Sequence, residues 1–502
     1  MSPLEGRRPR ALAGATGLAA LCALALASAW SDGTARAAPR AMTAAPDFDA
    51  AARAVRATLA DLVAADTSNP PGNESRAARI AAKRLEKAGI PFEIDAFAPG
   101  RENLVARLRG DGTRRPLLLL AHTDVVGAEG QSWTSDPHRM VERDGFLVGR
   151  GVLDDLGMAA VALEVVILLH AQRAPLARDV VLAWTGDEES GGLGIRWQLE
   201  HRPETIDAEI ALNEGGAPIL DEAGRVKLVE MQAAEKLYQD YTIRARGPTG
   251  HSSVPVPGNA IYRLARALDR LAQHQFPARL LPVTRAWLSA RAPLEPPERA
   301  QAMSALAETK DQLPPDALRV VEADPTLAAT LRTTCVATML GGGTRVNALP
   351  AEATANVNCR ILPDETADDV QRQLAEVFAD PELAIEPSQE FGHATPSPLE
   401  GAVPDAVRKV APEVWPGAAI VPFMGRGATD SRHVRAHGVA AYGLGPIAVT
   451  ENDARRAHGI DERIPAASLR PAVEFFYRLV VALAGADGGA VHGAAAAHST
   501  AP

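Results

Sequence analysis

The chain has 502 residues, and its 52 lysine and arginine residues against 62 aspartate and glutamate residues give a formal net charge of −10 at pH 7. This negative balance argues against nucleic acid as a partner. Hydrophobic residues make up 46% of the chain and charged residues 23%, which is typical of globular proteins and excludes a disordered, collagen-like or coiled-coil chain.

An export signal is predicted at the N-terminus. Three arginines between residues 7 and 10 precede an apolar run at residues 11–29, and an Ala-Arg-Ala sequence at residues 35–37 provides a cleavage site. We therefore expect residues 1–37 to be a signal peptide, and the mature protein to be periplasmic or secreted without a stable membrane span. The alternative is an uncleaved membrane anchor, because an apolar run of this length can just span a bilayer.

The residues that follow predict a large α/β domain. In chain order, the expected elements are helices at 48–63, 75–88 and 157–169 and strands at 92–96, 116–121, 180–184 and 208–212. The last three strands are short, continuous apolar runs, a pattern typical of strands that are buried on both faces. Because strands alternate with helices, we expect a mainly parallel sheet with helices on both faces.

A smaller α+β domain is expected to interrupt this large domain. Its predicted elements are strands at 237–246, 333–340 and 353–361, a helix at 259–273, a turn at Gly341–Gly343 and an insertion of helices broken at prolines, at about 281–331. The α/β pattern then returns, with a helix at 367–378, a glycine-rich loop at 425–427 and a last helix at 466–483.

These elements define the expected domains. The large domain takes residues 46–236 and 364–483, the smaller domain takes residues 237–363, and a disordered tail takes residues 484–502. The insertion belongs to the smaller domain in this division. It either shapes a pocket for a bulky substrate group or thickens a dimer interface.

Two cysteines remain after the expected cleavage, Cys335 and Cys359. They fall on two predicted strands of the smaller domain, where they lie nearly opposite each other. An exported protein meets an oxidising environment in which such cysteines can pair. The sequence is compatible with a disulfide and with two buried free thiols.

Polar clusters follow the three buried strands. The first strand leads into His122 and Asp124, the second into the Asp187-Glu188-Glu189 run, and the third into Glu214, while an acidic pair at residues 154–155 precedes a helix. In open α/β sheets the ligand crevice lies beyond the carboxyl ends of the strands, so these clusters should converge. Histidine with several carboxylates is a donor set typical of zinc.

Six motifs occur in a fixed order along the chain. They are His122-x-Asp124, Gly149-Arg150-Gly151-x-x-Asp154-Asp155-x-Gly157, Asp187-Glu188-Glu189-x-Gly191-Gly192, Asn213-Glu214-Gly215-Gly216, Gly250-His251-Ser252-Ser253-x-Pro255 and His458-Gly459-x-Asp461-Glu462. From about residue 50 to residue 483 the sequence thereby resembles the M20 metallopeptidase family. Val125-Val126, Trp133, Pro137 and Glu235-Lys236 resemble the branch that includes carboxypeptidase S and secreted N-acyl-amino-acid hydrolases. The resemblance implies a zinc-exopeptidase-like catalytic domain and a lid or dimerisation domain.

The resemblance also implies two zinc ions per subunit. By matching positions, Asp154 bridges the two ions, His122 and Glu214 hold one, and Glu189 and His458 hold the other. A hydroxide shared by the ions would be the attacking group. Carboxylate-rich sites also accept cobalt or manganese, so a hydrolase that uses another metal is an alternative.

The remaining roles come from the same resemblance. Glu188 matches the general base, with a structural buttress as the alternative, and Asp124 is expected to accept the other imidazole N–H of the histidine ligand. His251 matches a histidine that stabilises the oxyanion, in relatives usually at the active site of the dimer mate. Asn347 and Arg360 match positions that hold the substrate carboxylate, with a surface ion pair as the alternative for Arg360.

The predicted protein is therefore a homodimeric zinc hydrolase that cleaves an amide bond next to a free carboxylate. A carboxypeptidase, a dipeptidase and an N-acyl-amino-acid hydrolase all fit this description, and its partners are small substrates rather than nucleic acid. A catalytically inactive relative that serves as a binding protein is the alternative from another class. It would be expected to lose ligands or the base, and this chain keeps all of them.

Overall fold

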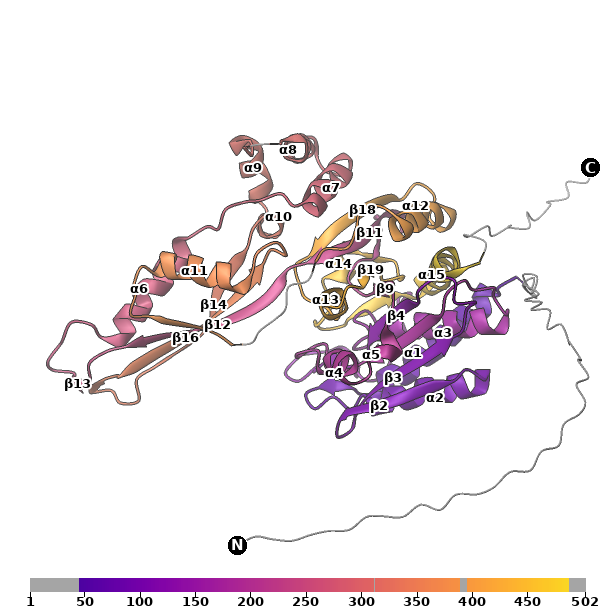
Figure 1. Cartoon of the computed structure of the whole chain (residues 1–502), viewed down its shortest axis with the longest axis horizontal. Helices are drawn as coiled ribbons and strands as arrows, with labels where there is room; N and C mark the ends of the chain where they lie inside the picture. The colour runs from indigo at the N-terminus through magenta and orange to yellow at the C-terminus, as the bar shows by residue number, and fades with distance from the viewer. Residues whose placement is uncertain (1–44, 311, 389–394, 487–502) are drawn as a thin grey trace, which may run out of the picture. The chain divides into compact units, whose positions relative to one another are not determined.

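The computed structural model describes residues 45–310, 312–388 and 395–486, and these residues belong to one compact unit (Figure 1). The predicted signal peptide and most of the predicted tail lie outside the described residues. Within the described part of the chain, no helix is both long enough and apolar enough to cross a membrane.

A sheet of ten strands forms the centre of the larger domain. Its strands, in spatial order, are β2 (Phe92–Ala98), β3 (Arg101–Leu108), β8 (Val180–Thr185), β4 (Leu117–His122), β9 (Ile210–Asn213), β19 (Ala440–Gly443), β11 (Val226–Glu235), β10 (Pro218–Leu220) and β20 (Val449–Thr450), while β18 (Ala419–Gly425) pairs with β11. The central strands β8, β4, β9 and β19 are parallel, as the sequence predicts. The sheet is nevertheless mixed, because β2, β3 and β11 form antiparallel pairs.

Helices cover both faces of this sheet, which explains the continuous apolar runs. Leu117 and Leu119 of β4 pack into a core with the helices α1 (Phe48–Ala65), α2 (Ser75–Ala88), α3 (Leu156–Ala171), α12 (Ala402–Val414) and α15 (Leu469–Ala484). Leu118 and Leu120 point to the opposite face, toward α4 (Leu193–His201), α5 (Pro203–Ile206) and α13 (Ser431–Ala436). Successive side chains of a strand alternate between faces, so a strand that is buried twice needs apolar residues at every position.

The smaller domain, which we call the lid, is a four-stranded antiparallel sheet with two helices. Its strands lie in the order β14 (Thr334–Gly342), β16 (Glu352–Ile361), β12 (Leu237–Arg246) and β17 (Ala384–Pro387), and its helices are α6 (Ala260–Gln273) and α11 (Ala367–Phe378). Cys335 and Cys359 are directly opposite in register and form a disulfide. The predicted turn at Gly341–Gly343 is wrong: Gly341 and Gly342 still pair within β14, so the chain turns later.

The helical insertion packs on the larger domain, although the sequence analysis grouped it with the lid. It comprises α7 (Pro282–Arg291), η1 (Ala292–Leu294), α8 (Pro297–Glu308), α9 (Pro315–Glu322) and α10 (Pro325–Thr330), and each α-helix begins at a proline, which suits the first helical position. Val283, Trp287 and Leu288 of α7 join the core of the large sheet, where α7 packs against β18.

Short elements connect these parts. They are β1 (Ser68–Asn69) paired with β5 (Val125–Val126), the small sheet of β21 (Arg463–Pro465), β7 (Phe146–Val148) and β6 (Val141–Arg143), β13 (Gly250–His251) paired with β15 (Ala348–Leu349), α14 (Glu451–Ala454) and η2 (Ala466–Ser468).

Candidate active site

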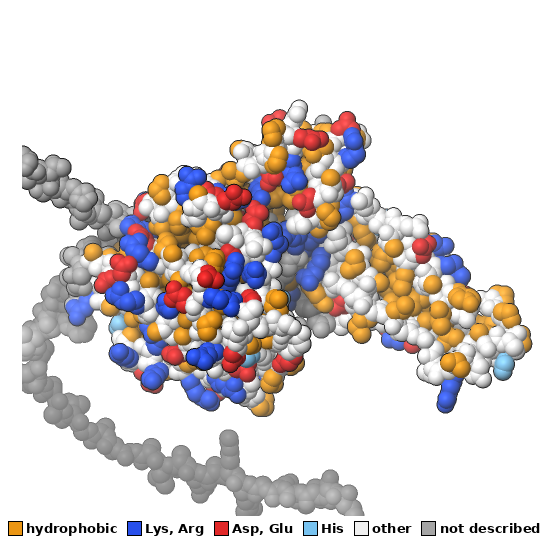
Figure 2. Space-filling model, turned by 180° about the vertical axis from the view of Figure 1, so that it is seen from behind, with side chains coloured by type: hydrophobic (Ala, Val, Ile, Leu, Met, Phe, Trp, Pro, Cys, Tyr) orange, Lys and Arg blue, Asp and Glu red, His pale blue; other side chains and the backbone are white. Residues whose placement is uncertain are grey.

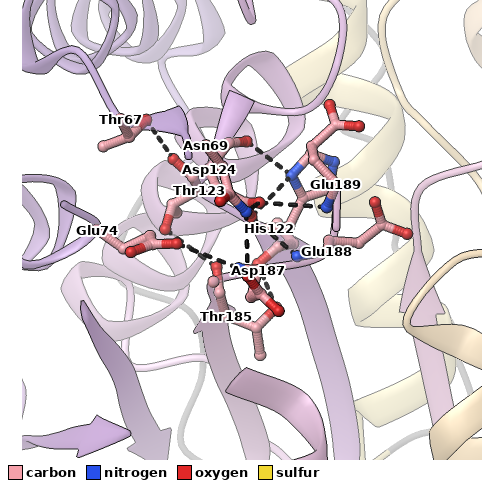
Figure 3. Close-up of polar contacts among 12 residues, drawn as sticks. Thr67, Asn69, Glu74, His122, Thr123, Asp124, Thr185, Asp187, Glu188 and Glu189 are labelled. Atoms are coloured by element: carbon pink, nitrogen blue, oxygen red, sulfur yellow. Dashed lines mark hydrogen bonds and ion pairs between the residues drawn. The ribbon is translucent and has the colours of Figure 1, made fainter. Parts of the chain in front are cut away.

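Strand ends bring the predicted polar clusters together. His122 is the last residue of β4, the Asp187-Glu188-Glu189 run follows β8, and Glu214 follows β9. In the parallel register, His122 lies opposite Thr185 at the end of β8, so the two clusters start at the same height (Figure 3). The sequence prediction that these clusters converge at one sheet edge is confirmed.

Two groups of histidine and carboxylate side chains share Asp154. In the first group, His122 Nε2 lies 3.1 Å from Asp154 Oδ1 and 3.8 Å from Glu214 Oε1. In the second group, His458 Nε2 lies 3.1 Å from Asp154 Oδ2 and 3.0 Å from Glu189 Oε2. Among the described residues, each group offers three ligand atoms that lie within 4.8 Å of one another. Each oxygen of Asp154 faces one group, which is the arrangement that a bridging carboxylate needs.

The charges of the site fit cations. Burial and neighbouring carboxylates raise the pKa of Glu214 and of Glu188 well above the ordinary value, and burial raises the pKa of Glu189. Oε1 of Glu189 is buried and has no hydrogen-bond partner among the described residues. Acidic groups crowded in this way disfavour their own ionisation, and bound cations would relieve the repulsion. The donor set and the unsatisfied oxygen therefore suit two metal ions.

The histidines compensate part of this negative charge. Hydrogen bonds with Asp154 and Glu189 raise the pKa of His458 to about 10. Burial opposes protonation of His122, but its contacts with Asp124 and Asp154 raise its pKa well above the ordinary value. The same hydrogen bonds lower the pKa of Asp154 despite its burial. The pattern indicates that cations are favoured at both ends of the shared carboxylate.

Asp124 orients the site differently from the sequence prediction. His122 Nδ1 lies 2.9 Å from the backbone carbonyl of Asp124 and 3.7 Å from its carboxylate, so the carbonyl is the closer acceptor. The carboxylate instead accepts the backbone N–H groups of Glu188 (3.1 Å) and Glu189 (3.2 Å) and the amide of Asn69 (2.8 Å) (Figure 3). Asp124 therefore fixes the histidine through its backbone and the adjacent glutamates through its side chain.

A buried ion pair supports the loops that carry Asp154 and His458. Arg150 Nη1 donates to Glu462 at 2.7 Å, and both side chains are almost fully buried. The carboxylate of Glu462 accepts the backbone N–H groups of Leu153 and Asp154, and Arg150 Nη2 donates to the carbonyl of His458 at 3.3 Å. The sequence motifs contain Arg150 and Glu462, but their spacing does not reveal this pairing.

A cavity of about 570 Å³ connects the two groups of candidate metal ligands with the lid. Asp154, Glu188 and His458 lie on one side, and Arg360 on β16 lies on the other. The guanidinium of Arg360 stacks over the Tyr238 ring at 4.6 Å, and among the described residues no carboxylate is within ion-pair distance of it. Arg360 therefore faces the cavity, and the alternative prediction of a surface ion pair is not seen.

The other two lid residues predicted from the sequence, His251 and Asn347, do not line this cavity. His251 on β13 and Asn347 before β15 lie together, because the N–H of Ser252 donates to the carbonyl of Asn347 at 3.0 Å. Both are exposed, beyond the end of β12 that is remote from the metal groups. At about 3.3 Å per residue the ten residues of β12 span roughly 30 Å. The structure therefore groups Arg360 with the candidate metal ligands and separates His251 and Asn347 from them.

Sequence reasoning missed several residues of the cavity wall. These are Gln232, Tyr238, Asp240, Phe423 and Arg426. Tyr238 donates to Asp240 at 2.6 Å, and Asn358 donates to the same carboxylate at 2.9 Å. Successive side chains of β12 alternate between faces, which places Tyr238 and Asp240 on the same face. The sequence pattern does not indicate what that face contacts.

A second, larger cavity of about 920 Å³ lies along α1 and α2. Basic side chains dominate its wall, and among the described residues Asp61 is the single carboxylate in it. No histidine of the described part of the chain lines it, so these residues offer no histidine–carboxylate ligand set.

Comparisons with known proteins agree with this geometry. The sequence model of peptidase family M20/M25/M40 matches residues 118–482, more than half of the chain. The chain is 28% identical over 376 residues to the human N-fatty-acyl-amino acid synthase/hydrolase PM20D1, covering 74% of each protein. It is 28% identical over 389 residues to the probable carboxypeptidase S-like 2 of Dictyostelium discoideum, covering 75% of this chain and 74% of that protein.

A solved structure shares the fold. The M20 family metallo-carboxypeptidase Sso-CP2 from Sulfolobus solfataricus superposes with a TM-score of 0.63 at 18% identity. The superposition covers 85% of this chain and 98% of that protein. The predicted resemblance to the family and the predicted fold are confirmed.

Proposed function

Because the chain belongs to peptidase family M20/M25/M40, we propose that it hydrolyses an amide bond next to a free carboxylate with the help of two zinc ions. The observation that carries the proposal is the single cavity in which Arg360 faces both groups of candidate ligands. An arginine opposite a metal pair can hold a carboxylate while the neighbouring carbonyl reaches the metals. The substrate itself fixes the distance between its carboxylate, held by Arg360, and its scissile carbonyl, at the metals.

Five side chains would hold the metals. Asp154 would bridge them, with His122 and Glu214 on one ion and Glu189 and His458 on the other. Bound zinc ions would polarise the scissile carbonyl and lower the pKa of the attacking water. The remaining chemistry falls to the protein, which must move a proton, position the substrate and stabilise the developing charge.

Glu188 is the proposed general base. It lies in the active-site cavity beside Glu189, yet in neither group of ligand atoms. Its buried carboxylate belongs to neither group of ligand atoms, so it is available to take a proton from water and pass it to the leaving amine. Asp124 holds the backbone N–H of Glu188 and so positions the base.

Arg360 is the proposed carboxylate clamp within the same chain. Its planar guanidinium can bind a carboxylate through two parallel hydrogen bonds, and stacking on Tyr238 fixes the plane. Asn347 and His251 are proposed to act in the active site of a second subunit, because they lie together far from the metals of their own chain. There, Asn347 would contact the substrate carboxylate and His251 would stabilise the oxyanion.

A homodimer formed through the lid is part of this proposal. Strand β14 is an edge strand of the lid sheet, and exposed apolar side chains gather on it and on the adjacent helix α6. They include Val336, Met339, Leu340, Ile261 and Tyr262. Figure 2 shows hydrophobic side chains gathered over the lid. An exposed apolar edge strand is a ready surface for pairing with a second copy.

The proposed substrates are N-acyl-amino acids. The human relative named above is an N-fatty-acyl-amino acid synthase/hydrolase, and the site requires only an amide and a free carboxylate. Dipeptides present the same two groups, so a carboxypeptidase or dipeptidase is the second candidate, supported by the carboxypeptidase S-like relative.

Export is part of the proposal. The signal-like sequence at residues 1–37 and the disulfide between Cys335 and Cys359 support a periplasmic or secreted enzyme, because disulfides persist in oxidising compartments.

A substrate panel tests the proposed function. Zinc-loaded protein is incubated with N-acyl-amino acids, their carboxamide analogues and dipeptides, and the products are read by mass spectrometry. We expect the free amino acid to be released from the carboxylate forms and far less from the carboxamides. Cleavage of both forms at equal rates would contradict the carboxylate requirement, and faster cleavage of dipeptides would favour the second candidate.

A further inference from the structure

His458 is held less firmly by the protein core than the candidate ligands it shares the site with. Its side chain is 52% exposed, whereas the side chains of His122 and Glu189 are 1% and 6% exposed. His458 lies in the loop between α14 and β21, and its φ angle of 63° falls in the left-handed region that residues other than glycine rarely adopt. Contacts from outside the loop are therefore needed to hold this backbone.

The loop between β5 and β6 supplies such a contact through Gln131. Nε2 of Gln131 donates to the backbone carbonyl of His458 at 3.0 Å. Oε1 of the same amide accepts from Nη2 of Arg150 at 2.9 Å and from Nε1 of Trp133 at 2.8 Å. Arginine and tryptophan side chains only donate, so Oε1 must face them and the amide N–H is left for the carbonyl. A single orientation of Gln131 satisfies all three contacts.

Arg150 joins this amide to the rest of the site. Its guanidinium lies 5.0 Å from the centre of the Trp133 ring, and Nη1 is paired with the buried carboxylate of Glu462. Its backbone N–H donates to the carbonyl of Pro137 at 2.8 Å, which closes the β5–β6 loop onto the same arginine. Trp133 and Pro137, two of the residues that resemble one branch of the family, thus both contact Arg150.

A second contact joins the same two loops. The backbone N–H and the hydroxyl of Thr134 donate to Oδ1 of Asp461 at 3.0 Å and 2.9 Å. Asp461 also has a positive φ angle, of 50°. Both left-handed residues of the His458 loop are therefore bound by the β5–β6 loop, as expected where a neighbouring segment maintains an unfavourable backbone conformation.

We propose that Gln131 is a positioning residue for His458, and that Trp133 acts through Gln131. The inference rests on the proposed function, because it assumes that His458 binds a metal ion. With its carbonyl held by Gln131, His458 keeps Nε2 at 3.1 Å from Asp154 and at 3.0 Å from Glu189.

The effect should be confined to one of the two ions. Among the described residues, Gln131 and Trp133 share no hydrogen bond with His122 or Glu214, the candidate ligands of the other ion. Loss of the Gln131 amide should therefore release the His458 loop and leave the His122 group in place.

Gln131→Met should weaken the binding of one zinc ion. Methionine is close to glutamine in length and is uncharged, but its thioether cannot donate to the His458 carbonyl. Outer partners of metal ligands contribute roughly 10- to 100-fold to metal affinity, so we expect one of the two zinc-binding steps to weaken by about 10-fold or more. Competition with a chromophoric chelator measures both steps, and His458→Ala identifies the step that belongs to His458.

Trp133→Phe tests whether the tryptophan acts through Gln131. Phenylalanine keeps an aromatic ring beside Arg150 but lacks the N–H that holds the amide. Trp133→Phe should weaken the same zinc-binding step, and it should have no further effect when added to Gln131→Met. Additive losses in the double variant would show that Trp133 acts by packing, independently of Gln131.

Gln371→Met is the matched control. Gln371 is half-buried, as Gln131 is, and its Nε2 donates to a backbone carbonyl, that of Ile385 in the lid, at 2.7 Å. The same substitution there removes the same kind of hydrogen bond away from the candidate metal ligands, so both zinc-binding steps should stay unchanged.

Hydrogen–deuterium exchange of the zinc-free protein separates failure of this inference from failure of the proposed function. Amides of residues 456–462 should exchange faster in Gln131→Met than in the unaltered protein or in Gln371→Met. Faster exchange in a protein that binds no zinc would contradict the proposed function but not the hold of Gln131 on this loop. Unchanged exchange, or zinc-binding steps that weaken equally or not at all, would overturn the positioning role while leaving zinc-dependent hydrolysis intact.

Discussion

Glu188 and Glu189 are neighbours in sequence, but only Glu189 contacts a histidine. Glu189 Oε2 lies 3.0 Å from His458, whereas the carboxylate of Glu188 belongs to neither group of ligand atoms. Asp124 holds the backbone N–H groups of both residues, which lets one side chain turn to the metal position and leaves the other free in the cavity. This division of roles leads to the first prediction.

Glu188→Gln should keep metal and lose turnover. The amide has nearly the shape of the carboxylate but cannot take a proton, so we expect zinc content near that of the unaltered protein and turnover lower by roughly 100-fold or more. Elemental analysis after dialysis and steady-state kinetics measure the two quantities. If the variant loses metal and keeps its activity per bound zinc, Glu188 is a ligand and the roles of the adjacent pair are reversed.

The second prediction concerns the shared carboxylate. Asp154→Ala should empty both metal positions, because Asp154 contributes one oxygen to each group, whereas His122→Ala should mainly weaken one. Metal content after dialysis, expressed per chain, distinguishes the two variants. Equal residual zinc in both would count against the bridge.

At the scale of elements, strands β12 and β16 carry the lid residues that line the active-site cavity. Arg360 on β16 is paired in register with Tyr238 on β12, the strand that continues from β11 of the large sheet. The proposed carboxylate clamp therefore lies on two paired strands rather than on a loop. His251 and Asn347, in contrast, lie on short elements beyond the far end of β12, so variants of the two groups should fail in different ways.

Arg360→Ala should act on substrate binding. Loss of a charged hydrogen-bonded pair should raise KM by about 10- to 100-fold for a carboxylate substrate and much less for its carboxamide. His251→Ala should instead lower kcat for both substrates alike, since it acts on charge that develops only in the transition state. Kinetics with the paired substrates measure both effects. A uniform loss in the Arg360 variant would show that it does not bind the carboxylate.

Lys236, at the junction of β11 and β12, should make the free energy of unfolding depend on pH. Burial, with Arg360 and Arg426 nearby, lowers the pKa of Lys236 to about 7, and its ammonium donates to the carbonyl of Arg332 at 2.6 Å. Because the folded state holds this proton less tightly than the unfolded state, the lysine decreases the free energy of unfolding as the pH falls from about 10 toward 7. Below about pH 7 both states are protonated and the loss is constant.

Compared with the unaltered protein, the Lys236→Met variant should therefore gain stability at pH 7 relative to pH 9. We expect the difference in unfolding free energy between variant and unaltered protein to change by about 2 kcal/mol between these values, in favour of the variant at pH 7. Urea denaturation at both pH values measures it. Lys87→Met, at an exposed position of α2, is the control and should show no such change. A pH-independent difference would mean that Lys236 titrates like an ordinary lysine.

For the molecule as a whole, the separation of His251 from the metals of its own chain predicts complementation between subunits. His251→Ala and Glu188→Gln homodimers should each be inactive. After subunit exchange, half of the dimers are mixed and each has one intact site, so activity should return to roughly a quarter of that of the unaltered protein. No recovery, with exchange confirmed by native mass spectrometry, would mean that His251 does not act across a dimer.

The sequence predicts the centre of this molecule better than its periphery. Continuous apolar runs reveal β4, β8 and β9, and their strand ends place His122, Glu188, Glu189 and Glu214 together. Asp154 and His458 lie in loops, and only their motifs indicate that they belong to the same site. Strand β11 was missed because Lys227 and Glu230 interrupt its apolar pattern.

Packing partners were harder to predict than elements. The prolines mark the insertion helices correctly, but an apolar stripe on a helix does not reveal which domain it meets, so the insertion was grouped with the lid. The acceptor for His122 Nδ1 could not be deduced either, because a carbonyl and a carboxylate of the same residue, Asp124, compete for it. Spacing in sequence does not resolve such short-range choices.

The central claim is that two metal ions, held by five side chains around Asp154, enable amide hydrolysis by this chain. The most direct test is to strip the protein with a chelator and titrate it with zinc while following both bound metal and amino acid released from an N-acyl-amino acid. We predict no release without metal, binding that saturates at two zinc ions per chain, and no release at any zinc level from Asp154→Ala. Full activity in the stripped protein, or undiminished zinc binding by Asp154→Ala, would contradict the account.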